Sequence, residues 1–291
     1  MEVGYPIMKL DLKIVEPIVR SALAEDIGFG DITTESVVEE NQIGKASLVV
    51  KEPGVIAGLD VAACAFHLVD PKLTITYLAK DGETIAKGQA VMEVEGSARS
   101  ILTAERVALN FLQRMSGIAT KTARFVEQVR YYNAKITDTR KTTPGLRVLE
   151  KYAVRVGGGR NHRFGLFDAV LIKDNHIEMA GGVKEAIMAA RHHIPHTTKV
   201  EIEVETLEQI EEALEVKADI IMLDNMSLEI MREAVERIAG RAIVEASGGV
   251  TEENIVDIAK TGVDFISIGA LTHSVKSLDI SLDIVALGRE E

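Results

Sequence analysis

The chain has 291 residues, of which 46% are hydrophobic, so it can bury a large core and does not have the composition of a disordered protein. Its net charge of −12 disfavours a general nucleic-acid binder, because polyanions are repelled except at local basic patches. We expect neither a membrane helix nor a secretory signal. The single cysteine, Cys64, excludes an internal disulfide and a Cys-x-x-Cys zinc site, so we expect a cytoplasmic protein.

Residues 1–115 predict an α+β domain with an antiparallel sheet. Apolar residues recur at helical spacing over residues 10–25. A longer helical pattern runs from residue 98 to residue 130, with Gly117 as a candidate break. We expect residues 275–291 to return to this first domain. Alternating character between turn signals predicts three strands, at residues 45–51, 73–77 and 90–94.

Residues 116–274 predict a β/α barrel, either closed or incomplete, of six or seven strands. Short apolar runs alternate with amphipathic stretches six times after Tyr132, which favours a parallel sheet covered by helices. An open doubly wound sheet is the alternative, although no Gly-x-Gly-x-x-Gly follows a strand to indicate dinucleotide binding. The six runs are residues 135–139, 169–173, 200–204, 219–223, 242–246 and 264–268.

Basic residues concentrate in one part of this acidic chain. From Lys135 to Lys173 there are nine lysines and arginines against three acidic residues. Arg147, Lys151 and Arg155 are spaced four apart, so we expect them to form a solvated helix face. The other positions indicate a polyanionic ligand, because guanidinium groups bind carboxylates and phosphates in two-point contacts. These positions are Arg140, Lys141, Arg160, His162, Arg163 and Lys173.

Acidic residues alternate along one of the predicted strands. Glu201, Glu203 and Glu205 would all point to one face, which in a barrel is the interior. Buried carboxylates must be paired with cations, protonated, or bound to a metal such as Mg²⁺ carried by a phosphorylated substrate. Asp224, at the end of the next strand, extends this acidic wall. A solvated edge strand is the alternative interpretation.

Glycine turns follow the last two predicted strands. They are Ser247-Gly248-Gly249 and Gly269-Ala270. Turns at these positions of a β/α barrel often bind a phosphate through backbone N–H groups. The two turns therefore predict a phosphate site.

Twelve short stretches, taken in chain order, resemble the motifs of the quinolinate phosphoribosyltransferase family. Together they span nearly the whole chain. The matching stretches are Glu25–Gly28, Gly30–Thr34, Thr103–Arg106, Asn110–Phe111, Ser116–Thr120, Thr139–Arg147, Gly157–Gly159, Asn161–Arg163, Ile172–His176, Glu203–Glu205, Leu223–Asn225 and Ser247–Gly249. The resemblance implies transfer of ribose 5-phosphate from phosphoribosyl pyrophosphate to quinolinate. Carbon dioxide is lost, nicotinate mononucleotide and pyrophosphate are formed, and Mg²⁺ is the metal.

The resemblance also implies roles for individual residues. The quinolinate site would consist of Arg106, Thr139, Arg140, His162, Arg163 and Lys173, with Arg106 donated across the interface of a homodimer or higher oligomer. The catalytic residues would be Lys141, Glu203 and Asp224, and the two acids would also hold the metal, directly or through substrate and water. Phosphoribosyl pyrophosphate would contact Lys141, Lys173, Glu203, Asp224, Ser247, Gly248, Gly249, Gly269 and Ala270.

Three other interpretations stay open on the sequence. A phosphoribosyltransferase of the same fold could use another acceptor, such as nicotinate, although a need for several basic groups favours the dicarboxylate quinolinate. A Schiff-base aldolase could use Lys173 at its strand end. The third is a phosphate-binding barrel without catalytic activity.

Overall fold

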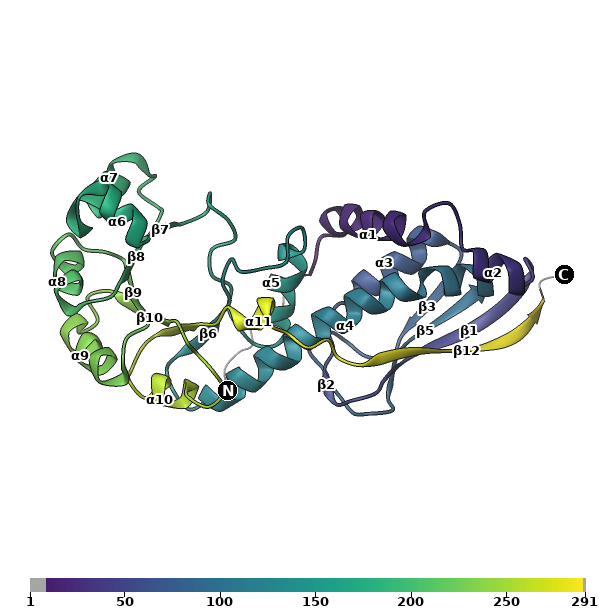
Figure 1. The fold of residues 1–291 in the computed structure, drawn as a ribbon. Helices are drawn as coiled ribbons and strands as arrows, with labels where there is room; N and C mark the ends of the chain where they lie inside the picture. The colour runs from purple at the N-terminus through teal and green to yellow at the C-terminus, as the bar shows by residue number, and fades with distance from the viewer. Residues whose placement is uncertain (1–8, 290–291) are drawn as a thin grey trace. The chain divides into compact units, whose positions relative to one another are not determined.

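The computed structural model describes residues 9–289, which form two compact units (Figure 1). The first unit extends to Ala123, includes Thr143–Gly158 and resumes at Ser274. The second unit comprises Arg124–Thr142 and Gly159–His273. The predicted boundary between residues 115 and 116 and the division between Ala123 and Arg124 both fall inside one continuous helix, α4 (Ala98–Val129).

The first unit is built on an antiparallel sheet with the strand order β12-β1-β5-β3. Strand β12 comes from the C-terminal part of the chain and pairs with β1 from Gln42 to Val50. Side chains of β1 alternate between the surface and the core, where Ala46, Leu48 and Val50 are buried. The strands are β1 (Gln42–Val50), β3 (Thr74–Tyr77), β5 (Ala90–Ser97) and β12 (Ile280–Arg289), and β2 (Gly54–Val55) pairs separately with β4 (Thr84–Ile85).

Helices of the first unit include two that differ from the sequence expectations. Gly117 does not break α4; a Cβ there would collide with the carbonyl oxygen of Lys276, so glycine allows the C-terminal segment to approach closely. The prediction of a solvated helix face around Lys151 is wrong, because α5 (Arg147–Val156) is buried around most of its circumference and Lys151 is only 3% exposed. The other helices of this unit are α1 (Leu12–Ile27), α2 (Ile32–Val37) and α3 (Leu59–Val69), and α5 spans Arg147–Val156.

The second unit contains a six-stranded parallel sheet in the order β6-β11-β10-β9-β8-β7. Its strands coincide with the six predicted apolar runs. They are β6 (Lys135–Thr137), β7 (Val170–Ile172), β8 (Val200–Val204), β9 (Ile220–Asp224), β10 (Ile243–Ser247) and β11 (Phe265–Ser267). The intervening helices are α6 (Asp174–Ala180), α7 (Val183–His193), α8 (Leu207–Glu215), α9 (Leu228–Ile238), α10 (Ile255–Ala259) and α11 (Ala270–His273).

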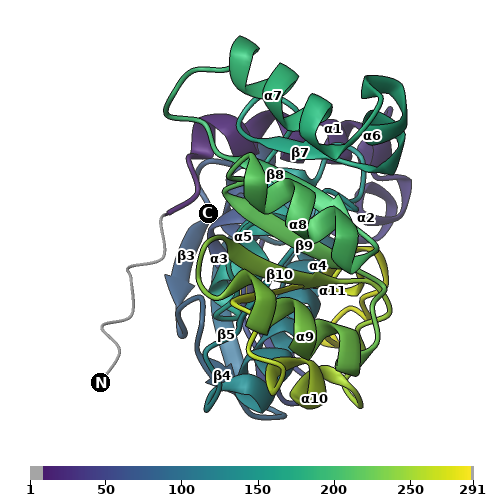
Figure 2. The same cartoon turned by 90° about the vertical axis from the view of Figure 1, so that its left-hand side faces the viewer.

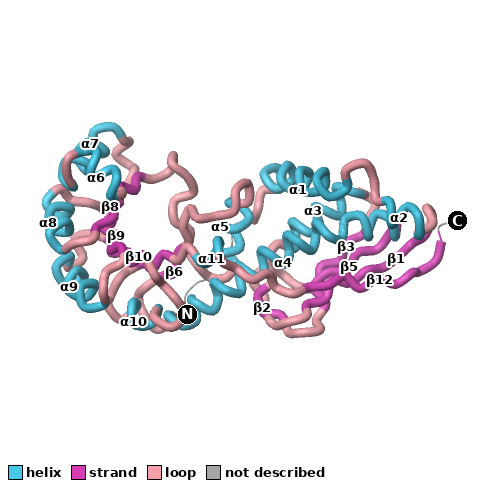
Figure 3. The backbone as a smooth tube through the Cα atoms, in the orientation of Figure 1, coloured by secondary structure: helices cyan, strands magenta, loops and turns pink. Residues whose placement is uncertain are grey.

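The helices α7, α8 and α9 lie on the same side of this sheet, as two perpendicular views show (Figures 1 and 2). Figure 3 shows the strands in magenta as a row inside the cyan helices. This arrangement confirms the β/α-barrel prediction over the doubly wound alternative, which requires helices on both faces. Among the described residues, β6 and β7 end the hydrogen-bonded order, so the barrel is of the incomplete kind. Beside β6, a parallel bridge joins Thr137 to Arg160.

Within the described part of the chain, no helix combines the length and the apolar character needed to cross a bilayer.

Candidate active site

The carboxyl ends of the parallel strands carry the predicted chemistry in the second unit. Parallel strands end at one edge of their sheet, so the residues that follow them come together there. Thr139, Arg140 and Lys141 follow β6, Lys173 follows β7, Glu203 lies in β8, Asp224 ends β9, Ser247 ends β10, and Gly269 follows β11.

Lys141 lies directly against one of the glycine turns. A Cβ at Gly269 would be 3.0 Å from Cδ of Lys141, so the lysine stem packs over this glycine. The Thr272 hydroxyl donates to the carbonyl oxygen of Lys141 over 2.7 Å, and the Lys141 N–H donates to Oγ1 of Thr139 over 3.0 Å. These contacts bring the exposed lysine to the predicted phosphate cradle.

The other glycine turn is linked to Asp224. Gly248 and Gly249 have φ angles of +93° and +59°, and a Cβ at Gly248 would collide with the side chain of Asn225. Asn225 donates its backbone N–H to the Ser247 carbonyl oxygen over 2.9 Å and its side-chain N–H to Asp224 over 2.8 Å. The turn therefore needs glycine, both for its backbone angles and for the close approach of Asn225.

A buried acid that the sequence reasoning missed anchors the basic loop after residue 159. Asp138 is completely buried beyond the end of β6. Its carboxylate accepts hydrogen bonds from the His162 backbone N–H over 2.8 Å and from the Asn161 side chain over 2.7 Å. Asp138 lies directly before the basic Thr139–Lys141 stretch, which is the signal that could have identified it. It fixes the loop that carries His162 and Arg163.

The guanidinium group of Arg163 is subject to the positive charge of a second guanidinium group, that of Arg140. Burial and then the charge of Arg140 lower the pKa of Arg163. Its Nη1 donates to the Ala169 carbonyl oxygen over 3.2 Å, and its buried Nε has no hydrogen-bond partner among the described residues. Like charges repel each other, and an anion bound to both guanidinium groups would relieve that repulsion.

The three glutamates of the predicted acidic strand have different environments. Strand β8 lies between β7 and β9, so the edge-strand alternative is wrong. Glu201 is 3% exposed, Glu203 is half-buried, and Glu205, beyond the strand end, is exposed. The expectation of an interior position is therefore wrong for Glu205, because the strand ends at Val204 and the chain turns into α8. Glu203 accepts a hydrogen bond from the Lys173 ammonium over 2.7 Å.

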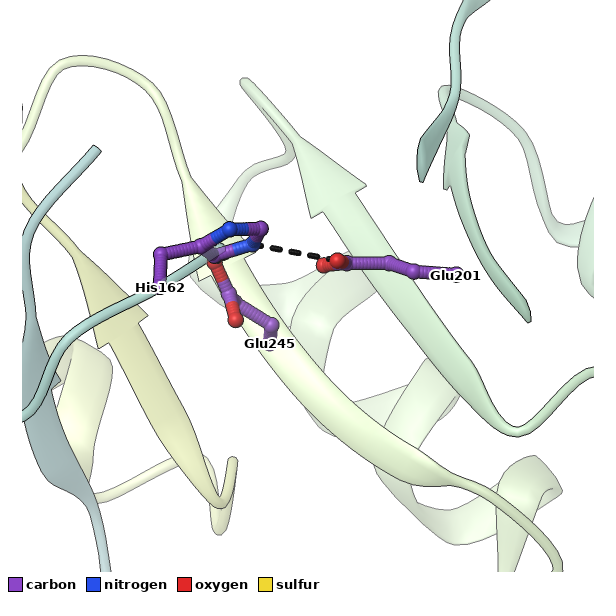
Figure 4. Close-up of side chains that lie close together, drawn as sticks. All are labelled: His162, Glu201 and Glu245. Atoms are coloured by element: carbon purple, nitrogen blue, oxygen red, sulfur yellow. Dashed lines mark ion pairs between the residues drawn. The ribbon is translucent and has the colours of Figure 1, made fainter. Parts of the chain in front are cut away.

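Glu201 instead belongs to a buried cluster with His162 and Glu245 (Figure 4). Nε2 of His162 lies 3.0 Å from Oε2 of Glu201 and 3.6 Å from Oε1 of Glu245. Burial, reinforced by the Glu201 charge and opposed by His162, raises the pKa of Glu245 to about 7. Glu245 was not predicted; it precedes Ser247 by two residues on β10, so strand alternation would have placed it on the same face.

Glu203 and Asp224 are the two acids predicted to hold a metal. Glu203 aligns with Met222 on β9, and Asp224 is two residues further, so both carboxylates are on one face of the sheet. Among residues 9–289, the cluster of three close ligand groups is His162, Glu201 and Glu245, and it includes neither of these acids. Mg²⁺ commonly takes one or two carboxylates together with substrate phosphates and waters. Glu203 and Asp224 fit that supporting role.

Arg106 lies in the first unit, on α4. Its side chain is 58% exposed, and its guanidinium is 3.9 Å from the carboxylate of Glu105. The role implied for Arg106 at a dimer interface stays a prediction.

This combination of features defines a class of protein. An incomplete β/α barrel carries arginines, a lysine–glutamate pair and glycine turns at its strand ends, and the chain also has an antiparallel-sheet unit. These are features of a β/α-barrel enzyme for phosphorylated and carboxylated small molecules. Two family models, described as the N-terminal and C-terminal domains of quinolinate phosphoribosyl transferase, match residues 31–116 and 118–283. The chain belongs to the quinolinate phosphoribosyltransferase family.

Individual relatives agree with this assignment. The chain is 47% identical over 260 residues to a probable nicotinate-nucleotide pyrophosphorylase (carboxylating) of Bacillus subtilis, covering 89% of this chain and 90% of the relative. It is 45% identical over 293 residues to the chloroplastic nicotinate-nucleotide pyrophosphorylase (carboxylating) of Arabidopsis thaliana, covering 94% and 83%. The crystal structure of NadC from Streptococcus pyogenes has a TM-score of 0.93 and 47% identity, covering 96% of this chain and 99% of that one.

Proposed function

We propose that the strand-end site transfers ribose 5-phosphate from phosphoribosyl pyrophosphate to the ring nitrogen of quinolinate, releasing pyrophosphate and carbon dioxide and forming nicotinate mononucleotide. The observation that carries this proposal is the gathering of basic groups at one edge of the parallel sheet, where Arg140 follows β6, Lys173 follows β7, and Arg163 is held by the Ala169 carbonyl oxygen. A ligand with two adjacent carboxylates supplies one anionic partner for each guanidinium. Lys173 would add a third basic group and Thr139 a neutral hydroxyl, and together they would orient the quinolinate ring.

Lys173 supports this reaction rather than an aldolase. Its Nζ donates a hydrogen bond to Glu203 over 2.7 Å, so the amine is directed at a carboxylate, as a group that binds an anionic substrate would be. The same ion pair holds the Glu203 carboxylate beside the proposed ribose position. When pyrophosphate leaves C1 of the ribose, positive charge develops on the sugar, and this carboxylate stabilises it in a partly desolvated site.

Lys141 and the two glycine turns would hold the phosphate groups. The lysine lies over Gly269, where its ammonium can neutralise charge on the departing pyrophosphate. Backbone N–H groups of the Ser247–Gly249 and Gly269–Ala270 turns would bind the 5-phosphate. Glu203 and Asp224 would hold Mg²⁺ through substrate oxygens and water, and the ion would offset further negative charge on the leaving group.

Decarboxylation follows from the product of the transfer. The C–N bond to the ribose leaves the ring nitrogen positively charged. When the neighbouring carboxylate leaves as carbon dioxide, its bonding electrons stay on the ring carbon next to that cation and then take up a proton. Arg140 and Arg163 contribute by holding the ring in this orientation.

The active assembly would be a homodimer or a higher oligomer in which Arg106 reaches the neighbouring subunit's site. Its exposure on α4 leaves the guanidinium accessible to a second subunit. A cytoplasmic location is supported by the single cysteine, since reducing compartments do not select for disulfides.

Calorimetric titration of quinolinate and of nicotinate tests the proposed specificity. Nicotinate lacks one carboxylate and would leave one guanidinium without an anionic partner, which costs about 1.5–3 kcal/mol, or roughly tenfold to a hundredfold in affinity. We expect that preference for quinolinate in the wild-type chain and in the control variant Arg232→Ala, whose side chain is exposed on α9. Equal affinity for the two acids would contradict the proposal.

A further inference from the structure

Asn225 has a backbone conformation that is uncommon for a residue with a side chain. Its φ angle is +52°, in the left-handed region. The other non-glycine residues with a positive φ among residues 9–289 are Lys217 and Ala239, and both lie at the end of a helix, where this conformation is usual. Asn225 instead follows β9 directly. A left-handed residue in such a place is held by its surroundings and often belongs to a functional site.

The left-handed conformation lets the backbone and the side chain of Asn225 make two different contacts. Strands β9 and β10 pair in parallel, with Asp224 beside Ser247. The Asn225 backbone N–H donates to the Ser247 carbonyl oxygen over 2.9 Å and so extends this ladder by one bond. Its side chain turns back and donates to Oδ2 of Asp224 over 2.8 Å. One residue therefore holds both the acid at the end of β9 and the glycine turn after β10.

The Asp224 carboxylate determines how the Asn225 amide is oriented. A carboxylate accepts hydrogen bonds, so Nδ2 of Asn225 faces Asp224 and its Oδ1 faces the other way. That oxygen packs on Gly248, where a Cβ would collide with it. Oδ2 of Asp224 is thus occupied, whereas no residue in the described part of the chain bonds to Oδ1. Oδ1 is the atom that can face a ribose hydroxyl or a water on Mg²⁺.

The contact between Asn225 and Asp224 adds little to the stability of the fold. Asn225 is exposed and Asp224 is only half-buried, so water can replace the hydrogen bond between them. The left-handed backbone of a non-glycine residue also costs free energy. The consequence of the contact is therefore geometric: it fixes the direction of one carboxylate in the proposed site.

We propose that Asn225 is a positioning residue for phosphoribosyl pyrophosphate: its side chain holds the Asp224 carboxylate while its backbone holds the Ser247–Gly249 turn. This inference rests on the proposed function, in which Asp224 and the turn both contact that substrate. A ribose held at the same time by its hydroxyls and by its 5-phosphate requires a fixed spacing between the acid and the phosphate turn, because the reacting atoms must be aligned. Asn225 sets this spacing without contacting the substrate.

Replacing Asn225 with Gly tests this role. Glycine accepts a φ of +52°, so the backbone contact to Ser247 stays while the side chain is lost. We expect kcat and kcat/KM for phosphoribosyl pyrophosphate to fall about tenfold, the loss expected for one hydrogen bond to a charged group. Quinolinate affinity, measured by calorimetric titration, should stay at the wild-type value. The matched control is Lys217→Gly, which removes a side chain at another left-handed position and should change neither quantity.

A second variant, Asn225→Asp, separates the hydrogen-bond donor from the shape of the side chain. Aspartate has nearly the same size and also tolerates the left-handed region, but it lacks the N–H and adds a negative charge beside Asp224. We expect a loss of kcat/KM at least as large as in Asn225→Gly. Wild-type kinetics in Asn225→Asp would show that shape is sufficient and would overturn the proposal. This variant keeps the test decisive if Asn225→Gly does not fold.

A double-mutant cycle shows whether Asn225 acts through Asp224. In the Asp224→Ala background the Asn225 side chain has no carboxylate to hold, so we expect Asn225→Gly to change kcat/KM by less than about twofold. A loss of about tenfold that persists in this background would show that Asn225 acts in another way and would overturn the proposal.

The wild-type chain separates failure of this inference from failure of the proposed function. If it releases no pyrophosphate from phosphoribosyl pyrophosphate and quinolinate, the proposed function fails and the inference fails with it. If the wild-type chain is active and Asn225→Gly has the same kinetics, or loses quinolinate affinity to the same extent as kcat/KM, only the inference fails.

Discussion

Replacing Glu245 with Gln should change how the stability of the protein depends on pH. Burial raises the pKa of Glu245 from 4.5 to about 7. The folded protein therefore keeps a proton that the unfolded chain releases above pH 4.5. Between these two values the wild-type free energy of unfolding falls as pH rises, and the loss is complete once Glu245 ionises in the folded state. At 1.36 kcal/mol per pKa unit, the total loss is about 3 kcal/mol.

Glu245→Gln removes this titration, because the amide stays neutral and has nearly the shape of the protonated acid. We expect the variant to gain about 3 kcal/mol relative to the wild type between pH 4.5 and pH 7.5. Urea unfolding followed by circular dichroism at several pH values gives this difference. Glu208→Gln, exposed near the start of α8, is the control and should show no such gain. If the difference in free energy of unfolding between Glu245→Gln and the wild type does not change with pH, the reasoning is refuted and Glu245 ionises normally.

Three further outcomes are expected. Arg140→Ala and Arg163→Ala should each weaken quinolinate binding by roughly tenfold to a hundredfold and leave phosphoribosyl pyrophosphate binding nearly unchanged, as separate calorimetric titrations would show; equal losses for both ligands would remove these arginines from the quinolinate site. Glu203→Gln and Asp224→Asn should lower kcat and kcat/KM together while quinolinate affinity persists, and a wild-type rate in steady-state kinetics would exclude the residue concerned. Co-expressed Arg106→Ala and Lys141→Ala subunits should recover up to about a quarter of wild-type activity, because half of randomly formed dimers are mixed and each mixed dimer has one intact site. No activity in a verified heterodimer would refute the exchange of Arg106.

The parallel strands could be predicted because their signal is local. Each is a short apolar run between amphipathic stretches, and all six coincide with strands of the second unit. Charged residues directly after such runs, as at Lys141 and Lys173, can also be located, because parallel strands end at a common edge. Periodicity does not show which strands begin and end the sheet, so the incomplete barrel needed the structure.

The buried polar contacts could not be predicted, since they depend on residues far apart in the chain. His162 meets Glu201 and Glu245 only because β8 and β10 are placed on either side of β9. Lys151 reads as a solvated residue by its spacing from Arg147, yet packing of α5 buries it. The position of Asp138 beside the Thr139–Lys141 stretch marks it as a candidate, but its hydrogen bonds to Asn161 and His162 join residues 23 and 24 positions apart and cannot be read from the sequence.

The central claim is that this site joins quinolinate to the ribose of phosphoribosyl pyrophosphate. Incubating the purified chain with both substrates and Mg²⁺, while quantifying pyrophosphate and nicotinate mononucleotide, tests it most directly. The account predicts equal amounts of the two products, much smaller amounts when low quinolinate is replaced by the same concentration of nicotinate, and much smaller amounts at low quinolinate for Arg163→Ala. Absence of product from the wild-type chain, or turnover of nicotinate as fast as quinolinate, would contradict it.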